Sequence, residues 1–145
     1  MSVTTTIIRR PDAALRLRML LAPRLAGRFE WGTRDCVLLA ADAAHAVTGH
    51  DPMADLRDRY ANARQAMRLL RSLGGMWALA EARFGRPRIR PLDGDTVLLR
   101  AAGPADDELA LGVWCAGGIM AQGERALVIR PAADAMGVWG WPCPA

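Results

Sequence analysis

The pair Asp35-Cys36 lies where a polar turn meets a long apolar segment, and it is the pair best placed to do chemistry. The segment from about Cys36 to Val47 predicts a helix apolar nearly all round, and Gly49 predicts its end. Backbone N–H groups and the helix dipole at such a start stabilise a thiolate, which makes a cysteine nucleophilic. A cysteine there is more commonly an inert apolar residue, so both interpretations stay open.

A nucleophilic thiol needs a base, and the only histidines in the chain are His45 and His50. His45 lies about 13 Å from Cys36 along the predicted helix axis, whereas a base must lie within about 3 Å. His50 follows the glycine end of the same helix and is excluded for the same reason. Glu108 is a conceivable replacement base, although the run 106–108 is more simply a solvated acidic turn.

The apolar spacing divides the chain into a helical half and a strand half. Helices are expected at about 12–23, 36–47, 61–73 and 76–84. In the first helix, Leu15, Met19 and Leu20 fall on one face, which predicts its buried side. Strands are expected at 96–100, 109–115, 119–122, 126–130 and 138–141. Strands that follow one another without a helix predict an antiparallel meander, and the proline-rich segment 86–91 is expected to be an extended linker between the halves.

These elements predict a single α+β domain over residues 1–145. A helical N-terminal layer at about 12–85 is expected to pack on a C-terminal antiparallel sheet at about 92–141. A length of 145 residues with 52% hydrophobic and 23% charged residues favours one globular core. No apolar run reaches the roughly 18 residues of a membrane span, and the first residues do not form a signal peptide. The sequence therefore predicts neither a membrane span nor secretion by its own signal.

All 19 basic residues are arginine, and their excess over the 15 acidic residues gives a net charge of only +4. This excess is too small for a dedicated nucleic-acid binder. The arginines of segment 83–90 leave a nucleic-acid-binding module as a third alternative, but they lack the interleaved aromatics typical of such modules. Arg64, Arg68 and Arg71 share one face of the predicted helix 61–73, which is either a solvated face or an interaction surface.

The remaining polar clusters predict no metal and no cofactor. Asp42 and His45 lie one helical turn apart in a spacing that matches no established ligand pattern, so either a structural contact between them or a hydrogen bond from a nearby backbone group to Asp42 is expected. Cys115 and Cys143 form neither a CxxC pair nor a zinc spacing and are expected to be passive. Trp139 and Trp141 share one face of the predicted last strand, where they either cover the core or meet a partner.

Several blocks of the sequence together resemble a known family. They are Phe29-x-Trp31-Gly32-x-x-Asp35-Cys36, Leu39-Ala40-Ala41-Asp42-Ala43, Thr48-Gly49-x-Asp51-Pro52, Tyr60, Leu92-Asp93-Gly94-Asp95-Thr96-Val97 and Ala110-Leu111-Gly112-Val113-Trp114. This pattern resembles small phage and prophage tail proteins related to NlpC-type, papain-like cysteine peptidases. It spans roughly Phe29 to Ile129, and its first block is the most specific.

The resemblance implies a papain-like fold and a site that is incomplete. It implies that Cys36 occupies the nucleophile position and faces the sheet near Ala110, which occupies the position of the family's histidine base. Gln122 falls at the position of the residue that orients this base. Because alanine cannot accept a proton, the resemblance implies a pseudoenzyme.

The function implied by the resemblance is a structural one. The family's relatives are components of the phage tail tip or baseplate hub, made in the bacterial cytoplasm and retained in the virion. The implied partners are tail hub, distal tail and central fibre proteins, and several copies per tail are compatible with such a role. The alternative is an active cysteine peptidase or amidase that acts on the bacterial cell wall during infection.

Overall fold

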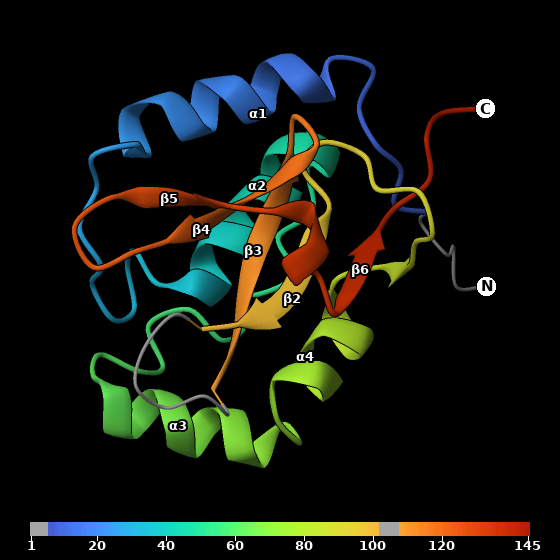
Figure 1. Cartoon of the computed structure of the whole chain (residues 1–145). Coiled ribbons are helices and arrows are strands. Elements are labelled where there is room, and N and C mark those ends of the chain that lie inside the picture. The colour runs from blue at the N-terminus through green and yellow to red at the C-terminus, as the bar shows by residue number, and fades with distance from the viewer. Residues whose placement is uncertain (1–5, 102–107) are drawn as a thin grey trace, which may run out of the picture.

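The computed structural model describes residues 6–101 and 108–145, which form four α-helices and six strands (Figure 1). The helices are α1 (Ala13–Leu21), α2 (Cys36–Thr48), α3 (Ala63–Ser72) and α4 (Met76–Arg83), and a 3-10 turn, η1 (Ala22–Arg24), follows α1. The predicted helices are therefore confirmed to within about two residues at each end. Gly49 ends α2 in the left-handed conformation, as its position predicts.

The strands form one antiparallel sheet in the order β1-β6-β2-β3-β4-β5. They are β1 (Arg86–Pro87), β2 (Thr96–Arg100), β3 (Leu109–Cys115), β4 (Gly118–Gln122), β5 (Leu127–Arg130) and β6 (Gly137–Gly140). The predicted meander is confirmed from β2 to β5. The last strand does not extend this meander, because β6 crosses over and pairs with β2. The expected linker is also corrected, since its first two residues form β1 and pair with β6.

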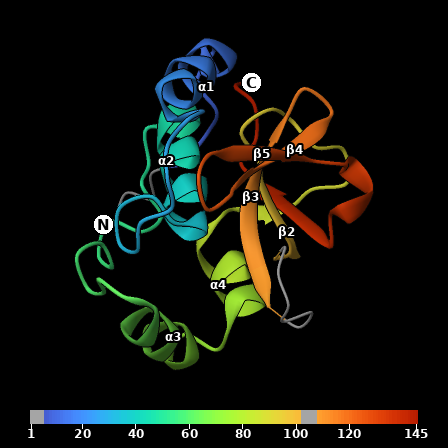
Figure 2. The same cartoon turned by 60° about the vertical axis from the view of Figure 1, so that its left-hand side comes forward.

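The predicted α+β class and the packing of helices on a C-terminal antiparallel sheet are confirmed. Helices α2 and α4 pack on one face of the sheet, and α1 packs on α2 (Figures 1 and 2). On this face Leu98 of β2, Leu111 of β3 and Trp139 of β6 join Phe84 at the end of α4 in the largest apolar cluster. The side chains of α2 thus fill the space between α1 and the centre of the sheet.

The opposite face of the sheet is covered by the sheet itself, which curves so that the end of β5 approaches the end of β2. Val97, Leu99, Ile119 and Ala121 form a separate buried cluster there. The end of β5 reaches the end of β2, because the Arg130 guanidinium donates a hydrogen bond of 3.1 Å to the carbonyl oxygen of Arg100. The turn η2 (Ala132–Asp134) and the following Ala135 then close over the cluster.

Helix α1 buries a different face from the predicted one. Ala13, Leu17 and Leu21 are buried against α2, whereas Leu15 and Met19 are exposed. The helix carries apolar residues on both of these faces, so its spacing alone leaves the choice open. The contact with α2 decides it, because the row at i, i+4 and i+8 begins with a small alanine that permits close approach.

A buried carboxylate fastens the N-terminal segment to the sheet. Asp95 is 2% exposed, with Arg9 Nη1 at 3.4 Å and Arg88 Nε at 2.6 Å from its oxygens. Arg9 also donates to the carbonyl oxygen of Asp93 at 2.6 Å. Burial raises the pKa of Asp95, while the two guanidinium groups and the Leu92 N–H oppose this rise. The start of the described chain is therefore held by ion pairs as well as by apolar packing.

Removal of the Asp95 carboxylate should lower the free energy of unfolding far more than removal of an exposed carboxylate. Asp95→Ala leaves the buried Arg9 without its partner and is expected to lower the free energy of unfolding by about 3–5 kcal/mol. Asp12→Ala, which breaks an exposed i, i+4 pair with Arg16, is expected to cost less than about 1 kcal/mol. Urea denaturation of both variants measures the difference, and equal losses would contradict it.

Candidate functional site at the Asp35-Cys36 turn

The carboxylate of Asp35 organises the turn before α2. It is 2% exposed and accepts hydrogen bonds from the N–H of Leu38 at 2.9 Å, the N–H of Gly32 at 2.9 Å and the hydroxyl of Tyr60 at 2.7 Å. The first bond is an N-cap that satisfies an otherwise unpaired donor of the helix. The other two join the preceding loop and the segment before α3 to the same group.

Tyr60 and Gly32, which both belong to the blocks that carry the resemblance, complete this arrangement. Gly32 has a φ of 79°, and a Cβ on it would lie 2.5 Å from the carbonyl oxygen of Tyr60. Burial and the bond to Asp35 raise the pKa of the Tyr60 hydroxyl, which therefore stays a donor. A buried tyrosine hydroxyl normally has a polar partner, and this signal could have linked Tyr60 to the acid beside Cys36.

Cys36 is the first residue of α2, as predicted, but its thiol is not prepared to ionise. Burial raises its pKa to about 11, and the charge of Asp35 adds to the rise, whereas hydrogen bonding with the backbone of Leu111 opposes it. The cost of burying a thiolate therefore exceeds the benefit of the helix start. The thiol is neutral at physiological pH.

The side of β3 that meets Cys36 is apolar. Leu109 and Leu111 belong to the same cluster as Cys36, whereas the side chain of Ala110 packs in the cluster on the opposite face. Alternate residues of a strand point to opposite faces, so the side chain of Ala110, the neighbour of Leu111, points away from the face that Cys36 meets, whereas the base position implied by the resemblance requires a side chain that faces the thiol. The residue that contacts the thiol is Leu111.

The candidate bases lie elsewhere. Glu108 is exposed and its carbonyl oxygen accepts from Ala101, while the adjacent residues 106 and 107 lie outside the described ranges. His45 and His50 are exposed at the far end of α2. Gln122 donates from its amide to the carbonyl oxygen of Gly27 at 2.9 Å, which ties β4 to the segment before the turn.

The expected contact between Asp42 and His45 is wrong. Asp42 instead pairs with Arg24 and Arg57, and Arg57 also pairs with Asp51 at 2.7 Å. This bridge joins η1, α2 and the loop after α2. In the described parts of the chain, no three His, Cys, Asp or Glu side chains come together as a possible metal site.

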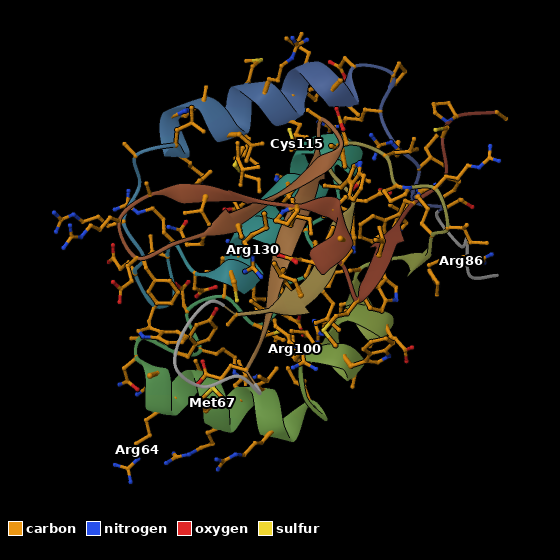
Figure 3. The ribbon with its side chains drawn as sticks, in the orientation of Figure 1. Arg64, Met67, Arg86, Arg100, Cys115 and Arg130 are labelled. Atoms are coloured by element: carbon orange, nitrogen blue, oxygen red, sulfur yellow. The ribbon has the colours of Figure 1, made fainter. Side chains whose placement is uncertain are left out.

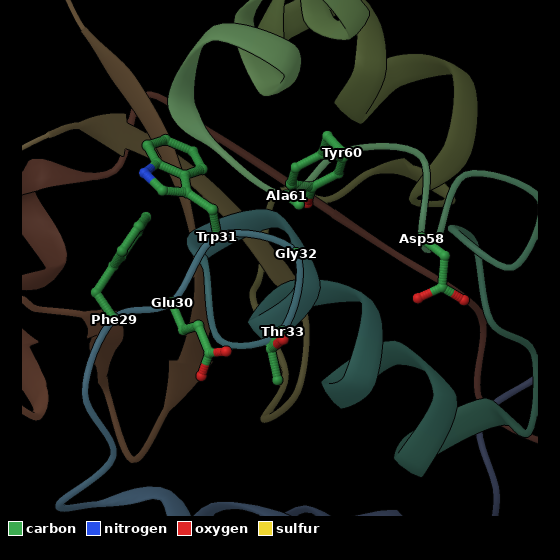
Figure 4. A pocket seen from close by; sticks show the side chains of 8 residues that line it. All are labelled: Phe29, Glu30, Trp31, Gly32, Thr33, Asp58, Tyr60 and Ala61. Atoms are coloured by element: carbon green, nitrogen blue, oxygen red, sulfur yellow. The ribbon is translucent and has the colours of Figure 1, made fainter.

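Two hollows lie near these segments. The first, of about 570 Å³, is next to the turn and is lined by Phe29, Glu30, Trp31, Gly32, Thr33, Asp58, Tyr60 and Ala61 (Figure 4). The second, of about 1180 Å³, lies between the loop after α2, the region of β1 and the end of β6. Trp31 and Gly32 of the turn are among the residues that line the first hollow. Cys36 lines neither hollow.

The two C-terminal tryptophans have different surroundings. Trp139 is 2% exposed and packs edge to face on Trp77 of α4, with ring centres 5.5 Å apart. The expectation that Trp141 shares its strand face is wrong, because β6 ends at Gly140. Trp141 lies beside His50 and lines the second hollow. Trp139 therefore covers the core, and Trp141 is the partly exposed one of the pair.

The fold and the turn define an α+β protein with a half-buried cysteine at the start of its capped central helix. The chain matches the family described as Domain of unknown function (DUF6950) over residues 8–141, and it belongs to this family. Neither a curated protein nor a solved structure matches the chain. In the described ranges, no helix is long and apolar enough to cross a membrane.

Two glycine variants can separate the effect of the contact between Gly32 and Tyr60 from the general energetic cost of placing alanine in a left-handed conformation. Gly32→Ala and Gly117→Ala both place alanine at a φ close to 80°, which costs about 1–2 kcal/mol, but only Gly32 has a neighbour in the way. Gly32→Ala is expected to be the more destabilising by at least about 1 kcal/mol, because the Tyr60 backbone must move. Thermal unfolding compares the two, and an equal loss of stability would refute the role given to this contact.

The reactivity of the cysteines should follow their environment. With a pKa of about 11, roughly one Cys36 thiol in 3,000 is ionised at pH 7.5. A variant that retains only Cys36 is expected to react with iodoacetamide at least tenfold more slowly than one that retains only the exposed Cys143. The Cys36 rate should rise with pH toward 11, since the thiolate is the reacting form. Equal rates at pH 7.5 would show an activated thiol.

Proposed function

We propose that this protein is a non-catalytic structural component of a phage tail tip or baseplate hub, built on a papain-like fold. The observation that carries the proposal is the protonation state of the Cys36 thiol, together with the apolar side chains that it contacts. The thiol stands at the nucleophile position of the family it resembles, but it is neutral and meets leucines of β3. A thiol without a base at hydrogen-bond distance is a poor catalyst of peptide hydrolysis.

The papain-like part of the proposal is supported by the arrangement around α2. The cysteine begins a buried helix, the helix packs on β3, and β3 lies in an antiparallel sheet. The same turn that would present a nucleophile is retained, with its capping acid, its glycine and its tyrosine. Retention of this turn without an activated thiol favours a stabilising use for these residues.

The tail role follows from the resemblance of the Trp31-Gly32-x-x-Asp35-Cys36 block to phage tail proteins. Its proposed partners are hub, distal tail and central fibre proteins, at a few copies per tail. A structural role requires that the protein folds and makes its surface contacts, and it does not require the sulfur of Cys36. Cys36→Ala removes the sulfur but leaves the Asp35 bonds in place, so it separates the two roles.

The proposal predicts that Cys36→Ala particles are as infectious as the wild type and carry the protein after washing. Asp35→Ala serves as the opposite variant, because it removes the cap and should lower both the stability of the chain and its incorporation. Quantitative mass spectrometry of washed virions and plaque titres measure both effects. A protein found in lysates but never in washed particles would overturn the tail role.

The purified protein is expected to release no peptide from peptidoglycan fragments. A release that disappears in Cys36→Ala would establish the alternative function, an active cysteine peptidase or amidase. Asp35→Ala is no substitute in this assay, because it perturbs the fold as well as the thiol.

A further inference from the structure

Helix α3 presents an outward face of three arginines and one methionine. Arg64, Arg68 and Arg71 are exposed, and Met67 is 41% exposed. At 100° per residue the three arginines lie within about 60° of one another, and Met67 falls between Arg64 and Arg71 along the helix. In Figure 3, Arg64 extends away from the body of the protein. We call these four residues the α3 face.

The opposite side of α3 attaches the helix to the body of the protein. Leu69, Leu70 and Leu73 pack against the main apolar cluster, but none of the ten residues of α3 is buried. The helix lies at the edge of the molecule in both orientations (Figures 1 and 2). Because its leucines hold it in place, the α3 face is directed to solvent.

The charge of the α3 face is uncompensated by the described residues. Among the described residues, eight of the sixteen arginines outside α3 pair with carboxylates, namely Arg9, Arg16, Arg24, Arg34, Arg57, Arg83, Arg88 and Arg130. The three arginines of α3 have no such ion pair within the described ranges, and the helix sequence from Ala63 to Ser72 contains no acidic residue. An i, i+4 acid is the usual means of neutralising an exposed helical arginine, and α3 has none.

We propose that the α3 face is a docking surface for an acidic segment of a partner protein that places an apolar side chain on Met67. Arginine and methionine are enriched at protein interfaces, and arginine binds carboxylates in a two-pronged geometry. Three cations release too few counterions for strong binding to nucleic acid, and the face has no aromatic ring on which a base could stack. The proposal rests on the docking role proposed above, but it does not depend on the assembly being a tail.

The test places a photo-crosslinking amino acid at position 67 of the full chain, in cells that naturally produce it. Met19, which is 67% exposed on α1, is the matched control position. The expected adduct at position 67 joins a partner peptide in which acids outnumber bases, and position 19 gives no such adduct. The adducts are identified by mass spectrometry after nuclease treatment.

Charge reversal then tests the arginines. Arg64→Glu/Arg68→Glu/Arg71→Glu is expected to reduce the position-67 adduct at least tenfold. Arg18→Glu/Arg90→Glu/Arg125→Glu changes the net charge equally at exposed sites and is expected to reduce it less than twofold. Circular dichroism confirms folding, and Arg68→Glu alone replaces the triple variant if that does not fold.

Several outcomes would overturn the proposal. They are no adduct at position 67, an adduct to a basic or neutral segment, an adduct to a second copy of this chain, an adduct to nucleic acid, and equal losses in the two triple variants. A Cys36-dependent hydrolase activity would refute the proposed function and leave this test unaffected. Absence of an acidic adduct from the chain with its native arginines would refute the docking surface, whereas the tail role would still be judged by washed particles.

Discussion

The buried carboxylate of Asp35 is the interaction on which the rest of the turn depends. It accepts hydrogen bonds from the start of α2, from the loop at Gly32 and from Tyr60. A buried carboxylate without donors would be strongly destabilising, so the three segments are fixed in their positions together. Because α2 is the helix that packs on β3, the carboxylate also sets how the sheet and the helices meet.

The same carboxylate helps to keep Cys36 neutral. A helix start favours a thiolate, but the charge of the neighbouring Asp35 and, above all, burial act against it. Asp35 therefore caps α2 and also disfavours the ionised form of Cys36. This combination explains how a turn of this kind can stabilise the fold while the thiol of its cysteine stays neutral.

Arginine occupies two different kinds of environment in this lysine-free chain. Inside, guanidinium groups join distant segments through carboxylates, as Arg9 and Arg88 do at Asp95 and as Arg24 and Arg57 do at Asp42. Outside, the α3 face lacks such partners among the described residues. A guanidinium can serve both purposes because it stays charged when partly buried and binds planar acids well at a surface.

The sequence by itself determined the elements whose signals are local. Asp35 as a cap, Gly49 as a helix end and the bounds of β2 and β3 follow from cap chemistry and residue spacing, which act over a few residues. The tertiary structure alone decided which face of α1 is buried, that β6 pairs with β2, and that Leu111 rather than Ala110 meets the thiol. These choices depend on strand register and on contacts between segments far apart in the chain. The elevated pKa of Cys36 belongs to the same class, because burial is a property of everything packed around a residue and no neighbour in sequence reveals it.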